Sequence, residues 1–219
     1  MAKSSFIDPN IVGYIRERTV REPEILAELR RETAKMPRAG MQISPDQGQF
    51  MALLMQLMGV RRYIEIGTFT GYSSLAVALA TPPEARLVCC DVSEEWTAVA
   101  RRYWAKAGVA DKIELKLGPA LPSLDRLLAQ GEAGKFDFAF IDADKSEHDA
   151  DYERCLQLVR RGGIVAVDNS LWGGSVVDAS DQTPDTVAIR ALNDKLKADE
   201  RVSVSLLAVG DGLMLALKR

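Results

Sequence analysis

The chain has 219 residues, of which 47% are hydrophobic and 27% are charged. This composition is enough to enclose one sizeable core, and we expect a single domain over residues 1–219. The 28 lysines and arginines nearly balance the 31 aspartates and glutamates, so a net charge of −3 provides no basic surface for nucleic acid or a membrane. A small-molecule partner is favoured, and without an apolar signal segment or membrane span we expect a cytoplasmic protein.

Residues 1–59 are predicted to form a helical region. Apolar side chains in residues 21–36 fall on one helical face among many charges, the pattern of an amphipathic helix that packs on a core or on a partner subunit. A second helix is expected over Pro45–Met58, because Ser44 can cap its first turn and Gln47 completes a capping box. Its apolar composition predicts that this helix is largely buried.

Residues 60–219 are predicted to form an α/β core. Five short apolar runs alternate with helical stretches, which indicates a doubly wound, mostly parallel sheet with helices on both faces. Two more strands follow, over residues 201–209 and 213–219, with only three residues between them. So short a connection cannot make a parallel crossover, and these strands should form a hairpin that adds one antiparallel strand.

Polar side chains lie at the ends of four of the five predicted strands. In an open parallel sheet, ligands bind beyond the carboxyl ends of the strands. At any single position a polar residue there could simply cap the next helix, but repetition over several strands favours a binding site. The residues concerned are Glu65, Asp91, Asp142, Asp144, Asp168 and Asn169, and the third strand ends in Gly118.

The first two strand ends have the layout of a nucleoside site. Glu65 and Asp91 lie at the ends of consecutive strands, with Gly67 and Gly71 between them. Phe69 stands where a G-x-G-x-x-G motif has its second glycine, so a ligand without a pyrophosphate is favoured over a dinucleotide. By itself the glycine pattern is equally compatible with a tight strand-to-helix turn.

Asp142, Asp168 and Asn169 offer hard oxygen donors, which suit Mg²⁺, Mn²⁺ or Ca²⁺. The single histidine, His148, cannot complete a zinc site. Lys145 follows Asp142 closely; it is either a solvated surface lysine or, beside a cation and in a pocket of low dielectric constant, a general base.

Four segments resemble the motifs of a known family. E65-I-G-T-F-T-G-Y-S, G118-P-A-L, I141-D-A-D-K and V167-D-N-S-L-W are similar to those of the cation-dependent O-methyltransferases, the caffeoyl-CoA and catechol O-methyltransferase group that uses S-adenosylmethionine. The resemblance runs from about Met41 to the C-terminal G210-D-G. It implies a seven-stranded Rossmann-like methyltransferase fold whose last strand is antiparallel, and a homodimer.

The resemblance also implies roles for individual residues. It assigns the metal to Asp142, Asp168 and Asn169, and catalysis to Lys145, as the base, together with Asp142. It places S-adenosylmethionine among Ile43, Glu65, Gly67, Thr68, Ser73, Asp91, Ala120, Asp142 and Asp144. It places the substrate among Met41, Lys145, His148, Asn169 and Trp172. Plant members have an aromatic residue shortly after the lysine, where this chain has His148, with Asp149 and Asp151 nearby; this departure should affect the substrate pocket more than the chemistry.

Methyl transfer from a sulfonium to an oxygen is an in-line displacement, which requires a positioned and anionic oxygen nucleophile. A divalent cation with open positions can bind two neighbouring hydroxyls, so a catechol-like substrate is expected. Three alternatives remain at this stage: a nicotinamide-dependent oxidoreductase, a non-catalytic Mg²⁺-binding signalling module, and a homologue without activity. The hard-ligand set and Phe69 count against the first, and the two N-terminal helices exceed what the second requires.

Overall fold

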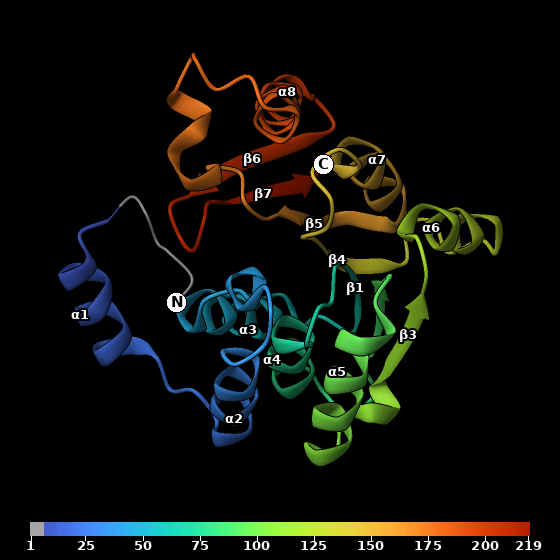
Figure 1. The fold of residues 1–219 in the computed structure, drawn as a ribbon. Coiled ribbons are helices and arrows are strands. Elements are labelled where there is room, and N and C mark those ends of the chain that lie inside the picture. The colour runs from blue at the N-terminus through green and yellow to red at the C-terminus, as the bar shows by residue number, and fades with distance from the viewer. Residues whose placement is uncertain (1–6) are drawn as a thin grey trace.

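The computed structural model describes residues 7–219 as a seven-stranded sheet with helices on both faces (Figure 1). The strand order is β3-β2-β1-β4-β5-β7-β6, and only β7 runs antiparallel to its neighbours. The predicted fold class is therefore confirmed. The strands are β1 (Arg62–Ile66), β2 (Arg86–Asp91), β3 (Ile113–Leu117), β4 (Phe136–Ile141), β5 (Val159–Val167), β6 (Val202–Leu207) and β7 (Leu213–Lys218).

Two apolar clusters separate the sheet from its helices, one on each face. Alternate residues of the strands point to opposite faces, so Tyr63 packs with α3, α4 and α5, whereas Ile64 packs with α6, α7 and α8. Figure 1 shows these two helical layers on either side of the sheet. The helices are α1 (Pro9–Thr19), α2 (Glu24–Thr33), α3 (Pro45–Met58), α4 (Tyr72–Ala80), α5 (Glu94–Lys106), α6 (Ala120–Ala129), α7 (His148–Leu158) and α8 (Pro184–Ala198).

The N-terminal helices differ from the sequence-based expectation in three respects. The amphipathic helix is shorter than residues 21–36, and α1, which buries none of its residues, precedes it as an additional helix. Helix α3 has the predicted bounds, but it is not largely buried, because Leu53 is 51% and Leu57 73% exposed. Ser44 caps α3 by accepting from the Gln47 backbone N–H at 3.4 Å, yet the Gln47 side chain faces Gly210 instead of completing the capping box.

Strand β5 begins before its apolar run. Helix α7 ends at Leu158, and β5 begins at Val159, several residues ahead of the apolar residues 164–167. A register shift between Phe136 and Phe138 accommodates this irregular start. None of the helices within residues 7–219 combines the length and apolar composition that a membrane span requires.

Candidate active site

The pairing of the central strands brings the predicted site residues to one edge of the sheet. Ile66 pairs with Ile141, and Ile141 pairs with Val167, so the residues that follow these three lie side by side. Two backbone hydrogen bonds extend the ladders, from Asp142 N to the Ile66 carbonyl at 2.8 Å and from Asp168 N to the Ile141 carbonyl at 2.9 Å. Asp91 closes the row on the far side of β1. Parallel strands thus place three acidic residues, Asp91, Asp142 and Asp168, along a single edge.

A tight turn after β1 joins this row to Asp91. The carboxylate of Asp91 accepts from the backbone N–H groups of Thr68 at 3.0 Å and Phe69 at 2.7 Å, and its other oxygen accepts from Ser93 N at 2.8 Å. Gly67 has a φ of +89°, and a Cβ there would lie 2.1 Å from the Asp142 carbonyl oxygen. Because only glycine fits so close an approach, this turn brings the backbone against the end of β4.

Glu65 is fully buried beneath the same turn. Its Oε2 accepts from the Tyr63 hydroxyl at 2.9 Å, while its Oε1 has no hydrogen-bond partner among the described residues. Burial raises the pKa of Glu65 to about 7, although the hydroxyls of Ser73, Tyr63 and Thr68 oppose that change. A buried carboxylate oxygen without a partner calls for a cationic or hydrogen-bonding ligand.

Asp142 and Asp168 are neighbouring carboxyl groups whose pKa values are both raised. Burial raises the pKa of Asp142 to about 8; the Lys145 ammonium opposes this, and the neighbouring Asp168 adds to it. Burial likewise raises the pKa of Asp168, against the Asn169 N–H that its Oδ1 accepts at 2.8 Å. A cation between the two carboxylates would relieve both effects, so the donor set fits a divalent metal ion.

Asn169 is the third predicted ligand. Within the described part of the chain no group of three or more His, Cys, Asp or Glu side chains is arranged to hold a metal ion. A cation bound by Asp142 and Asp168 would therefore depend on an amide oxygen. Asn169 is adjacent in sequence to Asp168 and has a φ of +58°, a left-handed conformation that asparagine adopts more readily than most residues.

Lys145 is buried beside this pair, with an exposed fraction of 8%. Its Nζ donates to the Ala143 carbonyl at 3.0 Å and lies 3.3 Å from Asp142 Oδ1. The same Nζ lies 5.7 Å from the centroid of the Trp172 ring, a cation–π contact. Lys145 thus contacts one predicted metal ligand, Asp142, and one residue of the predicted substrate pocket, Trp172.

Other predicted residues lie further from this centre. Asp144 is exposed, and its carboxylate accepts from the Ser146 N–H and hydroxyl, which lower its pKa. His148 is buried with its Nε2 3.2 Å from the Ala143 carbonyl oxygen, and burial lowers its pKa to about 3, so its ring is neutral. Ile43 and Ala120 are buried, whereas Met41 is 44% exposed.

Two residues of this region were not predicted as parts of a site. Gln47 is buried and lies beside Asp168 and Gly210; it appeared in the sequence only as part of a helix cap. Asp211 accepts from the Asn169 side chain, although in the sequence it signalled only a hairpin turn. Only the packing of α3 and of the turn before β7 against the end of β5 shows that these two residues lie near Asp168 and Asn169.

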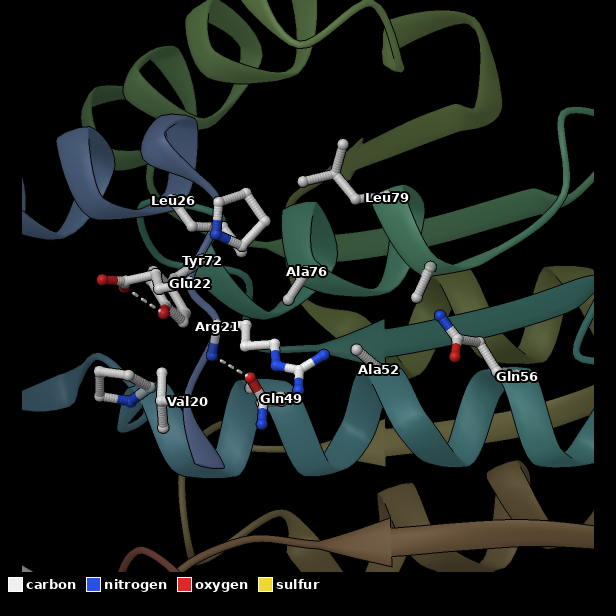
Figure 2. A pocket seen from close by; sticks show the side chains of 14 residues that line it. Val20, Arg21, Glu22, Leu26, Gln49, Ala52, Gln56, Tyr72, Ala76 and Leu79 are labelled. Carbon is white, nitrogen blue, oxygen red and sulfur yellow. Dashed lines mark hydrogen bonds between the residues drawn. The ribbon is translucent and has the colours of Figure 1, made fainter. Parts of the chain in front are cut away.

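A pocket of about 180 Å³ lies apart from this centre (Figure 2). It is bounded by α3, α4 and the segment before α2, and none of the residues predicted for the site lines it. At its mouth Glu22 accepts a hydrogen bond from the Tyr72 hydroxyl at 2.6 Å. The candidate active site is therefore the edge of the sheet and not this pocket.

The fold and the row of polar strand ends define a class I methyltransferase architecture. Residues 16–219 match the family model for O-methyltransferase, and the chain belongs to that family. This confirms the resemblance of the sequence motifs. It also confirms the class of S-adenosylmethionine-dependent O-methyltransferase of the caffeoyl-CoA and catechol type, in preference to an oxidoreductase or a signalling module.

Individual relatives agree with this assignment. The probable caffeoyl-CoA O-methyltransferase 2 of Dictyostelium discoideum is 46% identical over 95% of this chain and 91% of its own length. The catechol O-methyltransferase domain-containing protein 1 of Mus musculus is 44% identical over 94% of this chain and 78% of its length. The O-methyltransferase TomG of Streptomyces achromogenes, solved in complex with SAM, has a TM-score of 0.85 and 32% identity over 95% of this chain and 96% of that one.

Proposed function

We propose that this protein transfers the methyl group of S-adenosylmethionine to one hydroxyl of a catechol-like small molecule and requires a divalent cation, most simply Mg²⁺, with Mn²⁺ and Ca²⁺ as alternatives. The observation that carries the proposal is the pair of the half-buried Asp142 and the buried Asp168 beside Lys145, with both carboxyl pKa values raised. Asn169 supplies the third ligand. When bound, the cation would polarise and orient two neighbouring hydroxyls of the substrate.

The methyl donor would lie over the turn after β1. The unpartnered Glu65 Oε1 suits the cationic ammonium of S-adenosylmethionine. Asp91 uses each of its oxygens for backbone N–H groups, but carboxylate oxygens have further lone pairs that can accept from ribose hydroxyls. Gly67, Thr68 and Ser73 line the approach from the turn and the first residues of α4. The remaining predicted contacts are Ile43, Ala120, Asp142 and Asp144.

In this proposal Lys145, Trp172, Met41 and His148 have different roles around the reacting oxygen. As a neutral amine, the form that a neighbouring divalent cation would favour, Lys145 would accept the proton of the hydroxyl that is methylated, and the Ala143 carbonyl and the Trp172 ring hold its side chain in place. Trp172 and Met41 bound the aromatic part of the substrate. His148 stays neutral over the physiological pH range and supports the Ala143 carbonyl from below.

The proposal extends to the assembly and location of the protein. Residues 1–219 act as one methyltransferase domain, a homodimer in the cytoplasm, without nucleic-acid or membrane partners. The exposed apolar side chains of α1 and α3 support the dimer, because surfaces rich in such side chains favour association. They include Ile11, Tyr14, Leu53 and Leu57.

The decisive experiment combines a chelator with the Asp168→Ala variant. Turnover of a catechol panel with S-adenosylmethionine, followed by mass spectrometry with and without Mg²⁺, should disappear in EDTA and return when Mg²⁺ is added in excess. Asp168→Ala should lose turnover at least 100-fold, while calorimetry still detects binding of S-adenosylhomocysteine, because Glu65 and Asp91 are untouched. Full turnover in chelator would exclude the metal role.

A further inference from the structure

The turn between β6 and β7 packs directly on the loop that follows β5. Ser170 N donates to the Gly212 carbonyl at 2.9 Å, and Leu171 N donates to the Asp211 carbonyl at 3.0 Å. A Cβ at Gly212 would lie 2.5 Å from the Leu171 side chain, so the close contact depends on glycine. Asn169 and Asp211 are 42 residues apart in the sequence, yet the backbone hydrogen bonds between their segments hold them in one fixed arrangement.

This arrangement leaves the Asp211 carboxylate with two N–H donors. Its Oδ1 accepts from the Gly173 backbone N–H at 2.7 Å, and its Oδ2 accepts from the Asn169 side-chain Nδ2 at 3.2 Å. A carboxylate can only accept hydrogen bonds. The atom of Asn169 that faces Asp211 must therefore be the amide nitrogen, and the amide oxygen must point the other way.

We propose that Asp211 is a positioning residue that fixes the Asn169 amide so that its oxygen, and not its NH₂ group, is presented to the metal ion. The inference rests on the metal site of the proposed function. A cation is bound by an oxygen lone pair and repelled by amide hydrogens, so the two orientations of one amide differ strongly in affinity. Asp211 selects between them without touching the cation.

Two observations separate this role from direct coordination. Both carboxylate oxygens of Asp211 are directed at N–H groups of residues 169 and 173. Within residues 7–219, Asp211 also forms no metal-holding group with Asp142 and Asp168. Its charge does reach Asp168, whose pKa it helps to raise after the larger effect of burial. Asp211 thus contacts the proposed ligand Asn169 but not the cation itself.

The isosteric variant Asp211→Asn gives a sharp test. The Gly173 N–H belongs to the backbone and cannot be reversed, so it should keep the oxygen of the new amide. The new NH₂ group then faces Asn169, whose amide must rotate to offer its oxygen and turn its own NH₂ toward the cation. Mn²⁺ affinity should fall about 100-fold. In Asp211→Ala the Asn169 amide can adopt either orientation, so Mn²⁺ affinity should fall only about 10-fold.

A reciprocal exchange should restore the site. In the double variant Asn169→Asp and Asp211→Asn, the new NH₂ group at position 211 can donate to one oxygen of the new carboxylate at position 169. The other oxygen of that carboxylate faces the cation, and the net charge of the pair is that of the native protein. Mn²⁺ affinity should return to within about 10-fold of the native value.

The measurement is a titration of metal-free full-length protein with Mn²⁺ alone, with free Mn²⁺ followed by electron paramagnetic resonance. Asp194→Asn, an exposed change of equal charge on α8, is the matched control and should bind Mn²⁺ like the native protein. Thermal unfolding and calorimetric binding of S-adenosylhomocysteine check that each variant is folded. If Asp211→Asn does not fold, Asp211→Ala and the double variant still test the inference.

The order of the affinities decides between explanations. Loss greater for Asp211→Asn than for Asp211→Ala, with recovery in the double variant, supports the inference. Native affinity in Asp211→Asn, or greater loss in Asp211→Ala, as direct coordination or simple packing would give, overturns it. If the native protein itself fails to bind Mn²⁺, the metal site of the proposed function falls and the inference with it, which distinguishes the two failures.

Discussion

Asp151 should make the protein less stable as the pH rises. It is fully buried on α7 beside Cys90 and Cys155, and neither carboxylate oxygen has a hydrogen-bond partner among the described residues. Burial raises the pKa of Asp151 to about 7; the Glu147 carboxylate adds to this and Arg154 opposes it. The ordinary value is 3.8. The folded protein therefore holds a proton that the unfolded chain releases.

The magnitude follows from the two pKa values. Below pH 3.8 both states are protonated, and the group has no effect. Between pH 3.8 and about 7 only the unfolded chain loses its proton, so the free energy of unfolding falls as the pH rises. At about 1.4 kcal/mol for each pKa unit, the full loss is about 4 kcal/mol, and it stays constant at higher pH.

The variant Asp151→Asn removes the titration and keeps the shape of the side chain. We expect its free energy of unfolding, measured by urea titration, to rise relative to that of the native protein by about 3–4 kcal/mol between pH 4 and pH 8. The buried amide adds a constant cost of about 1–3 kcal/mol, which does not depend on pH. Asp149→Asn, an exposed change on the same helix, should show no comparable rise. A difference that is constant with pH would refute the reasoning, because Asp151 would then be ionised in the fold without penalty.

Three further changes test other parts of the structure. Gly67→Ala places a Cβ 2.1 Å from the Asp142 carbonyl oxygen at a φ of +89°, so calorimetry should show at least a 10-fold loss of S-adenosylhomocysteine affinity, with about 1–3 kcal/mol of backbone strain. Lys145→Ala should lower kcat about 100- to 10,000-fold in steady-state assays without changing that affinity; unchanged kcat would remove Lys145 from the reaction. Leu57→Glu should shift sedimentation velocity toward monomer, whereas Val187→Glu, at an exposed apolar position on α8, should not; a native-like dimer in Leu57→Glu would place the interface elsewhere.

The sequence predicted the sheet well because its central strands β1 and β4 are buried on both faces and are followed by polar residues. Runs such as Phe138–Ile141 are apolar throughout, and the change to Asp142 marks the end of β4. The antiparallel hairpin followed from a three-residue connection alone. The pairing of β4 with β5 then brings Asp142 beside Asp168, because each residue directly follows its strand.

The remaining features depend on tertiary contacts that leave no local pattern. Helix α1 has no buried face, so no apolar period indicated it. Composition alone overestimated the burial of α3, because Leu53 and Leu57 are apolar yet exposed. Asp151 was associated with the substrate pocket by its acidic neighbours, but it faces the interior. A polar residue at a helical position reveals its burial only when the packing of the helix is known.

The position of β7 also has a consequence for the synthesis of the protein. This strand follows every other strand in the chain, yet it lies between β5 and β6, and its preceding turn contacts Asn169 and Leu171. A ribosome that has translated as far as α8 has already made every proposed metal ligand, but it has not made the turn that orients one of them. The nascent chain therefore cannot orient the Asn169 amide through Asp211 until the turn that precedes β7 has left the exit tunnel, after all the proposed ligands have been made.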